Sequence, residues 1–144
     1  MTKLFAGIEG GGTKFVVAVG RPDGKILAET RIPTTTPEET LSRCVDFLQA
    51  QADALGSLAA IGVACFGPLD LQPASVNYGH ILSTPKNGWS NADILGSLRK
   101  AFDVPISIDT DVNGAALGEW RWGAAQGLEN FIYLTIGTGI GGGG

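Results

Sequence analysis

Two glycine-rich segments carry residues suited to binding phosphate. The segment from Leu4 to Lys14 reads LFAGIEGGGTK, an apolar run that ends in three glycines, Thr13 and Lys14. Glycine has no side chain to hold an anion away, so the backbone N–H groups of a tight turn over glycines 10, 11 and 12 can face phosphate oxygens, while Thr13 and Lys14 add a hydroxyl donor and a positive charge. Alone, this segment is also explained by an ordinary hairpin turn. The segment from Phe131 to Gly144, FIYLTIGTGIGGGG, repeats the design and favours phosphate binding.

A pair of aspartates supplies the best candidate for a catalytic base. The sequence DTDVN places Asp109 and Asp111 after an expected strand over 104–108 and before an expected helix that runs to about Gln126. In the first turn of a helix the macrodipole favours the ionised carboxylate of Asp111, which can orient a hydroxyl and accept its proton. Phosphoryl transfer suits such a modest base, because its loose transition state depends mainly on positioning and charge neutralisation. The alternative is that Asp109 or Asp111 only caps the helix.

The elements before these aspartates predict a mixed α/β sheet. Short apolar segments separated by the turn signals GGGTK and RPDG predict an antiparallel meander of three strands. A capping box, Thr36-Pro37-Glu38-Glu39, starts a helix that we expect to reach about Leu55, with its apolar stripe on Leu41, Val45, Leu48, Ala52 and Leu55. The expected strands of this part are Leu4–Glu9, Phe15–Gly20, Lys25–Ile32 and Ala60–Phe66, the last of them buried on both faces.

A long connection from Gly67 to Trp89 separates this part from a second helix, which we expect to start at Ser90, and a strand over Val104–Ile108. Connections of this length are usually functional or contain small elements of their own. Alternating strands and helices indicate helices packed on the faces of one sheet. Because ligands bind beyond the carboxyl ends of such strands, we expect GGGT, GPLD and DTDVN to converge on one cleft.

Composition limits the class of protein. The chain has 144 residues, 22 glycines and a formal net charge of −4. This length predicts one ordinary domain core, and the acidic balance without a basic cluster argues against a nucleic-acid partner. No segment approaches the roughly 20 apolar residues of a membrane span and the N-terminus lacks leader features, so we expect a soluble, cytoplasmic protein. Cys44 and Cys65, with no metal-binding spacing, are expected to be buried, reduced thiols.

Taken together, the motifs resemble the N-terminal part of ROK-family sugar kinases, and most closely their bacterial fructokinase branch, within the actin-like ATPase superfamily. The segments that carry the resemblance are GIEGGGTKFVVAVG, TPKNGW, DTDVNGAALGE and LTIGTGIGGG, in that order. The resemblance implies a ribonuclease-H-like/actin-like ATPase lobe with a mixed sheet flanked by helices. It also implies ATP-dependent phosphorylation of a hexose hydroxyl. The likeness to the fructokinase branch implies that fructose is converted to fructose 6-phosphate.

The resemblance also implies roles for individual residues. Asp111 would be the general base, and the sugar would be contacted by Gly67, Gly88, Trp89 and Asp111. The phosphates of ATP would be bound by Gly11, Gly12, Thr13, Lys14, Gly137, Thr138 and Gly139, with Mg²⁺ bridging them. Glu9 stands where many family members have aspartate, and would face this magnesium through water. Thr110 stands where many have asparagine, which removes an amide from the sugar site and bears on discrimination among hexoses.

Family kinases have two lobes and are about twice this long, which predicts how the chain divides. We expect residues 1–128 to form the N-terminal kinase lobe, and residues 129–144 to form the first strand and phosphate loop of an incomplete second lobe without its return strand. The family's structural zinc would belong to the missing part, since His80, an expected loop residue, and two scattered cysteines cannot supply it. We expect the fragment alone to be a poor or inactive kinase, and the complete protein to be a homodimer.

Several alternatives stay open at the level of sequence. A glucokinase-like or broad-specificity hexose or amino-sugar kinase, or a non-catalytic sugar-binding ROK protein, would carry similar motifs. A sugar-sensing ROK regulator would need an N-terminal helix-turn-helix, and the first strand begins at Leu4. Trp89 is either a sugar platform or a core residue, whereas Trp120 and Trp122 are expected to pack in the protein.

Overall fold

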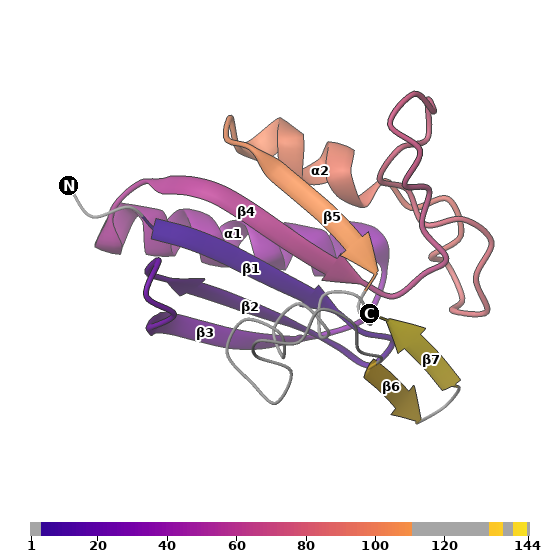
Figure 1. Cartoon of the computed structure of the whole chain (residues 1–144). Helices are drawn as coiled ribbons and strands as arrows, with labels where there is room; N and C mark the ends of the chain where they lie inside the picture. The colour runs from indigo at the N-terminus through magenta and orange to yellow at the C-terminus, as the bar shows by residue number, and fades with distance from the viewer. Residues whose placement is uncertain (1–3, 111–132, 137–139, 144) are drawn as a thin grey trace.

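The computed structural model describes residues 4–110, 133–136 and 140–143, and its main feature is a five-stranded sheet with the order β3-β2-β1-β4-β5 (Figure 1). A separate pair of short strands, β6 and β7, lies near the C-terminus of the sequence. The elements are β1 (Leu4–Gly10), β2 (Lys14–Gly20), β3 (Ile26–Pro33), α1 (Pro37–Leu55), β4 (Leu58–Cys65), α2 (Ile94–Ala101), β5 (Ile106–Thr110), β6 (Tyr133–Ile136) and β7 (Ile140–Gly143).

The sheet combines an antiparallel meander with a parallel core. β1, β2 and β3 pair antiparallel, as the turn signals predict, whereas β1 pairs parallel with β4, and β4 pairs parallel with β5. Cys65 lies beside Gly10 on one side and beside Thr110 on the other. The carboxyl ends of three parallel strands are therefore level, and the segments that follow β1 and β4 leave the sheet at the edge where β5 also ends.

Helix α1 follows its capping signals closely. The Glu39 N–H donates to the Thr36 hydroxyl over 3.2 Å, proline occupies the first turn, and the helix ends at Gly56, whose φ is 125°. The buried face carries Leu41, Cys44 and Leu48. Leu55, expected on the apolar stripe, is 44% exposed, because it is the last residue of the helix.

Helix α2 starts later than the sequence predicts, at Ile94 instead of Ser90. The Ser90 hydroxyl accepts a hydrogen bond from the Thr84 N–H over 3.0 Å, and Asn91 has a φ of 67°, which no helix allows. Asp93 is the actual N-cap, and its Oδ1 accepts from the Gly96 N–H over 2.8 Å. The helix therefore begins where a side chain is available to satisfy its first amides.

Two other expectations, for β5 and β4, differ from the structure. The last strand of the sheet is β5, shifted two residues beyond the expected 104–108, so Asp109 lies inside a strand and does not begin a helix. β4 alternates between buried and more exposed positions, and Gly62 is exposed, so the expectation of a strand buried on both faces is wrong for the described part of the chain. The helix expected to run to Gln126 lies outside the described residues.

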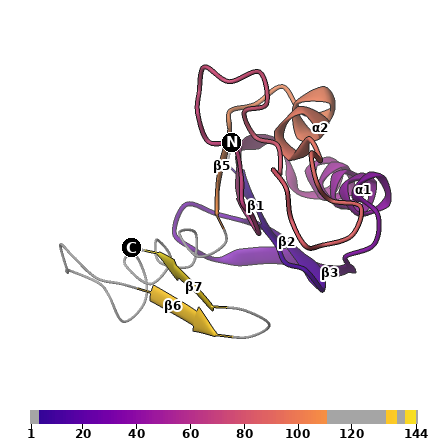
Figure 2. The same ribbon diagram turned by 90° about the vertical axis from the view of Figure 1, so that its right-hand side faces the viewer.

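In the described part of the chain, the core lies between the sheet and helices α1 and α2. α1 and α2 pack on the same face of the sheet (Figure 2), and β1 alternates accordingly, with Leu4, Ala6 and Ile8 buried and the residues between them exposed. The largest fully buried side chains include Trp89, Phe15, Leu48 and Leu98. This apolar layer fixes the hairpin between β1 and β2 and the loop before α2 against the same core.

The expected absence of a return strand after the second glycine-rich segment is wrong. β6 and β7 pair antiparallel, with Tyr133 beside Gly143 and Ile136 beside Ile140. The pairing uses backbone groups, so the glycines of β7 satisfy it without side chains. The expected boundary between residues 128 and 129 falls outside the described part.

Candidate functional site

The hairpin that joins β1 to β2 presents an exposed turn. Gly12, Thr13 and Lys14 are exposed, and a Cβ added to Gly12 would meet no atom within 4 Å. The Gly11 N–H, however, donates to the Lys14 carbonyl over 2.9 Å inside the turn. The expectation that glycines 10 to 12 all present their amides to an anion therefore does not hold for Gly11.

Gly10 has a packing role beneath this turn. A Cβ at Gly10 would lie 2.8 Å from the Phe15 ring and 2.9 Å from the Cys65 sulfur. Such distances are shorter than any real Cβ contact, so only glycine allows β1 to lie this close to the aromatic ring below it. The tip of the turn, Gly12 to Lys14, is thus exposed, whereas Gly10 at its base is tightly packed.

The loop from Gly67 to Asp93 is ordered by short bridges. Leu69 pairs with Ile81, His80 pairs with Asp93, and the Asp70 and His80 backbones exchange hydrogen bonds with residues on the opposite side of the loop. The His80 Nε2 lies 3.4 Å from the Asp93 Oδ1, so this loop histidine contacts the cap of α2. The long connection thus contains small elements of its own.

Asp70 is the polar centre of this loop. The Ser75 hydroxyl donates to its Oδ2 over 2.6 Å, and the Gln72 N–H donates to its Oδ1 over 3.0 Å. These two hydrogen bonds, the Ser75 bond first, and the nearby His80 lower the pKa of the Asp70 carboxyl below its ordinary value. The ionised carboxylate stabilises the first half of the loop that follows Gly67.

Trp89 is a core residue in this structure. Its side chain is fully buried, and its ring lies 5.5 Å from that of Phe15, stacked at 29°, and 5.5 Å from that of Phe66, edge-on at 64°. Its indole N–H donates to the Thr35 carbonyl over 2.9 Å. Of the two interpretations that the sequence leaves open, the structure supports the core residue. The neighbouring Gly88, with a φ of 84°, is exposed.

Carboxylates line the opposite face of the sheet from the helices. Glu9 is paired with Ala64, and Ala64 with Asp109, so the two acidic residues flank Ala64 on one face, and both are exposed. The Thr110 N–H donates to Oδ1 of Asp109 over 2.7 Å. Among the described residues no group of three or more histidine, cysteine or acidic side chains is arranged to hold a metal ion.

The structure brings some of the expected site residues to one edge and leaves others undescribed. Gly11 to Lys14 and Gly67 follow the level ends of β1 and β4. Asp111 comes directly after β5 in the sequence but lies outside the described residues, as do Gly137, Thr138, Gly139, Trp120 and Trp122. Thr34, which contacts the β1–β2 turn, and Thr35, which accepts from Trp89, were not predicted from the sequence. Their one signal there is the run of three threonines before the helix.

No helix within the described ranges is both long and apolar enough to cross a membrane. Cys44 and Cys65 are both buried and form no disulfide, as expected. Burial raises the pKa of the Cys44 thiol to about 12, which keeps it protonated. Cys65 is the last residue of β4, at the edge where the parallel strands end, and its side chain is buried.

A parallel β1-β4-β5 core, extended by an antiparallel meander of β1, β2 and β3, defines the class: this is a ribonuclease-H-like lobe of the actin-like ATPase type. The model of the ROK family matches residues 5–144, and the chain belongs to the ROK family.

Relatives with curated names agree with this assignment. The chain is 50% identical over 142 residues to a fructokinase of Zymomonas mobilis, which covers 98% of this chain and 47% of that protein. It is 45% identical over 140 residues to a putative fructokinase of Bacillus subtilis, covering 97% of this chain and 45% of that protein. The chain thus spans about half the length of the curated relatives it matches.

Solved structures give the same fold. The ROK hexokinase from Thermus thermophilus matches with a TM-score of 0.80 and 32% identity, over 96% of this chain and 45% of that one. A ROK glucokinase from Streptomyces griseus, solved in complex with glucose and AMPPNP, matches with a TM-score of 0.75 and 29% identity, over 96% of this chain and 43% of that one. Both matches extend over nearly all of this chain.

Proposed function

We propose that the protein carrying this chain transfers a phosphoryl group from ATP to a hexose hydroxyl. We further propose that the hexose is fructose and that the product is fructose 6-phosphate. This chain would supply the catalytic and sugar-binding lobe. The observation that carries the proposal is the level ending of β1, β4 and β5, which brings the β1–β2 turn, the start of the Gly67 loop and Thr110, the residue before Asp111 in the sequence, to one edge of the sheet. The 44–50% identity to fructokinases of several bacteria supports fructose as the substrate.

We assign the phosphates of ATP to the turn between β1 and β2, with a changed role for Gly11. Gly12, Thr13 and Lys14 are exposed there and would offer amide, hydroxyl and ammonium donors to the anion. Gly11 would act through the turn that it closes, since its own N–H is bonded to Lys14. Gly137, Thr138 and Gly139 would form the second phosphate loop. Magnesium would neutralise phosphate charge, and the exposed Glu9 carboxylate at the end of β1 suits a contact to its water.

Asp111 would orient the sugar hydroxyl and accept its proton. It follows β5 directly, and the last residue of that strand, Thr110, is paired with Cys65 at the level edge. Gly67 and Gly88 would bring backbone groups to the sugar, and the buried Trp89 would support Gly88 from below. We also propose a cytoplasmic location and a homodimeric state for the complete protein.

The substitution that tests the proposal is Asp111→Asn in the protein at its full natural length. Loss of the general base is expected to lower kcat by about a hundredfold or more, measured in a coupled assay with ATP and fructose. The control is Asp103→Asn, the same change at an exposed position before β5. Full activity in Asp111→Asn, with an unchanged melting temperature, would refute the assigned role.

A panel of hexoses in the same assay separates the fructokinase from its alternatives. A higher kcat/KM for glucose or an amino sugar than for fructose would identify a kinase of different specificity. Sugar binding without turnover would identify a non-catalytic ROK protein. We further propose that residues 1–144 alone phosphorylate fructose poorly, and turnover equal to that of the full-length protein would contradict this.

A further inference from the structure

Thr34, directly after β3, contacts the glycine hairpin at two points. Its backbone N–H donates to the Thr13 carbonyl over 2.9 Å, and its hydroxyl donates to the Gly11 carbonyl over 2.7 Å. These two carbonyls belong to the peptide groups on either side of the Gly12–Thr13 peptide. A single residue therefore holds both sides of the turn.

This contact sets the direction of two amides. In a trans peptide group the carbonyl oxygen and the amide N–H point in opposite directions, and in the part of the chain that is described the one cis bond is Gly67–Pro68. Because the Gly11 carbonyl points at Thr34, the Gly12 N–H points away from it. The Lys14 N–H does the same, because the Thr13 carbonyl also points at Thr34. Gly12 and Lys14 are both exposed residues of this turn.

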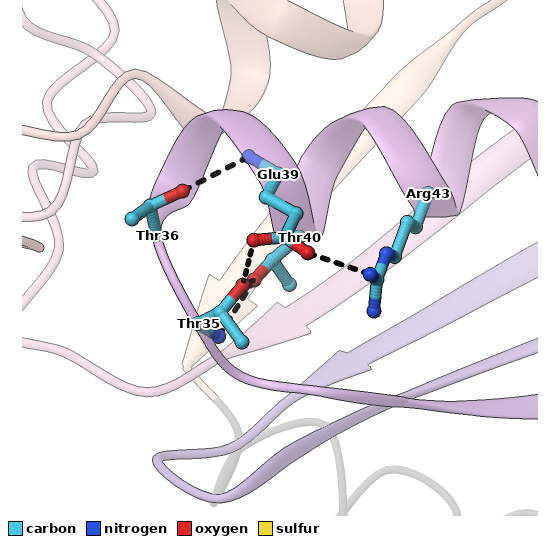
Figure 3. A network of polar contacts seen from close by, with 5 residues as sticks. All are labelled: Thr35, Thr36, Glu39, Thr40 and Arg43. Atoms are coloured by element: carbon cyan, nitrogen blue, oxygen red, sulfur yellow. Dashed lines mark hydrogen bonds and ion pairs between the residues drawn. The ribbon is translucent and has the colours of Figure 1, made fainter.

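Thr34 itself is held in place by the start of α1. The Thr35 N–H donates to the hydroxyl of the fully buried Thr40 over 3.0 Å, and the Thr35 hydroxyl donates to Glu39 over 3.1 Å (Figure 3). Glu39 in turn lies 2.6 Å from Arg43, one helical turn later. With the indole of Trp89 on the Thr35 carbonyl, the residue after Thr34 is bonded through its N–H, its hydroxyl and its carbonyl. These three hydrogen bonds of Thr35 restrict the position of the adjacent Thr34, which contacts the β1–β2 turn.

We propose that Thr34 is a positioning residue for phosphate binding, whose hydroxyl turns the Gly11–Gly12 peptide so that the Gly12 N–H faces the phosphates. The inference rests on the proposed function, since the anion it serves is the phosphate chain of ATP. Thr34→Val keeps the shape and the backbone bond to Thr13 but removes the hydroxyl donor. The Gly11 carbonyl then has no partner on that side, and the peptide loses its preferred orientation.

The test compares three variants at full natural length: Thr34→Val, Thr34→Ser and Thr30→Val. Thr34→Val is expected to raise KM for ATP by about three- to tenfold, the size of one lost hydrogen bond, while KM for fructose changes less than about twofold. Thr34→Ser restores the hydroxyl and should restore KM. Thr30→Val makes the same change earlier on β3, away from the hairpin, and should leave both constants unchanged.

A second readout does not depend on catalysis. In ¹⁵N-labelled protein, the amide signal of Gly12 should shift on addition of inorganic tripolyphosphate, and this response should weaken in Thr34→Val but persist in Thr34→Ser and Thr30→Val. If wild type shows the response and Thr34→Val weakens it, but no hexose is phosphorylated, the kinase proposal fails while the role of Thr34 stands. If wild type shows no response, the role of Thr34 is overturned whatever the enzymatic activity.

Two further outcomes would overturn the inference. Thr34→Val could leave both the KM for ATP and the Gly12 response unchanged, which would show that the hydroxyl does not position the turn. It could instead raise both KM values equally, without rescue by Thr34→Ser, which would show a general structural role.

Discussion

The indole N–H of Trp89 donates a hydrogen bond over 2.9 Å to the carbonyl of Thr35, a residue 54 positions earlier in the chain. The same ring stacks on Phe15, the second residue of β2. One side chain therefore connects the loop before α2, the segment before α1 and the strand that follows the glycine hairpin. The loop that carries Gly88, proposed to contact the sugar, and the β1–β2 turn, proposed to bind the phosphates, therefore share this support.

Trp89→Phe should destabilise the chain by about 1–3 kcal/mol. The substitution removes the indole donor, which leaves the Thr35 carbonyl without this partner, and it leaves a small cavity in the core. Urea denaturation followed by far-UV circular dichroism measures the loss without relying on tryptophan fluorescence.

The matched control is Val76→Ala in the same loop. Val76 is 95% exposed, so its truncation should change the free energy of unfolding by less than about 0.5 kcal/mol. An unchanged denaturation midpoint in Trp89→Phe would show that the buried indole is not an anchor of the loop.

Gly10→Ala and Gly12→Ala should differ in their effect on stability although they lie two residues apart. A Cβ at Gly10 would collide with the Phe15 ring and the Cys65 sulfur, so Gly10→Ala should cost about 1–3 kcal/mol of stability. A Cβ at Gly12 meets nothing within 4 Å, so Gly12→Ala should fold as well as wild type.

The two glycine variants should differ in a second property. The methyl group of Gly12→Ala lies on the exposed turn, where it would hold an anion away, so we expect weaker binding of an ATP analogue without loss of stability. Calorimetric titration and thermal melting of both variants separate the two effects. Equal melting temperatures for Gly10→Ala and wild type would contradict the packing described beneath the hairpin.

Asp93→Ala should destabilise the chain by about 1 kcal/mol, because it removes the acceptor for the Gly96 N–H at the start of α2. Asp93→Asn keeps an acceptor of the same length, and asparagine caps helices as well as aspartate does, so it should recover most of this loss. Thermal melting at neutral pH measures both. If Asp93→Asn is as destabilising as Asp93→Ala, the contact of the carboxylate with His80 outweighs the cap.

The carboxyl of Asp70 should titrate below the ordinary aspartate pKa of about 3.9, because the Ser75 hydroxyl, the Gln72 N–H and the nearby His80 favour the ionised form. A pKa that is lower in the folded state stabilises the fold at pH values above the unfolded pKa. This contribution is lost as the pH falls through the folded pKa.

Ser75→Ala removes the strongest of these effects and should raise the pKa of Asp70 toward its ordinary value, as observed in a carboxyl ¹³C NMR titration. Ser42→Ala, at an exposed position on α1, provides a control that should leave this pKa unchanged. No change in Ser75→Ala would mean that the hydroxyl bond does not favour the ionised carboxylate.

The sequence predicted most of the local structure, because local patterns carry it. The capping box from Thr36 to Glu39 placed the start of α1 correctly, and the turn signals placed the meander. The level carboxyl ends of the parallel strands also followed from general rules of such sheets. The capping box and the turns depend on residues close together in the chain, whereas the parallel pairing joins β1, β4 and β5, which lie far apart in it.

What the sequence did not reveal depends on residues far apart. Ser90 has the right chemistry for a helix cap, but its hydroxyl is bonded to Thr84, so Asp93 caps α2 instead. The core position of Trp89 depends on Phe15 and Thr35, and the role of Thr34 depends on a hairpin 23 residues earlier. No periodicity reports such contacts, because each is fixed only when the sheet is complete.

The two buried cysteines can serve as probes of local unfolding. Cys44 lies on α1 and Cys65 lies on β4, between β1 and β5 in the sheet, and both side chains are inaccessible in the folded state. Burial raises the pKa of the Cys44 thiol to about 12, so the folded chain keeps this thiol protonated as well as inaccessible. Alkylating reagents should therefore modify each thiol only when its element separates from the core. The two modification rates, resolved by mass spectrometry, would show whether α1 detaches on its own or only together with the sheet.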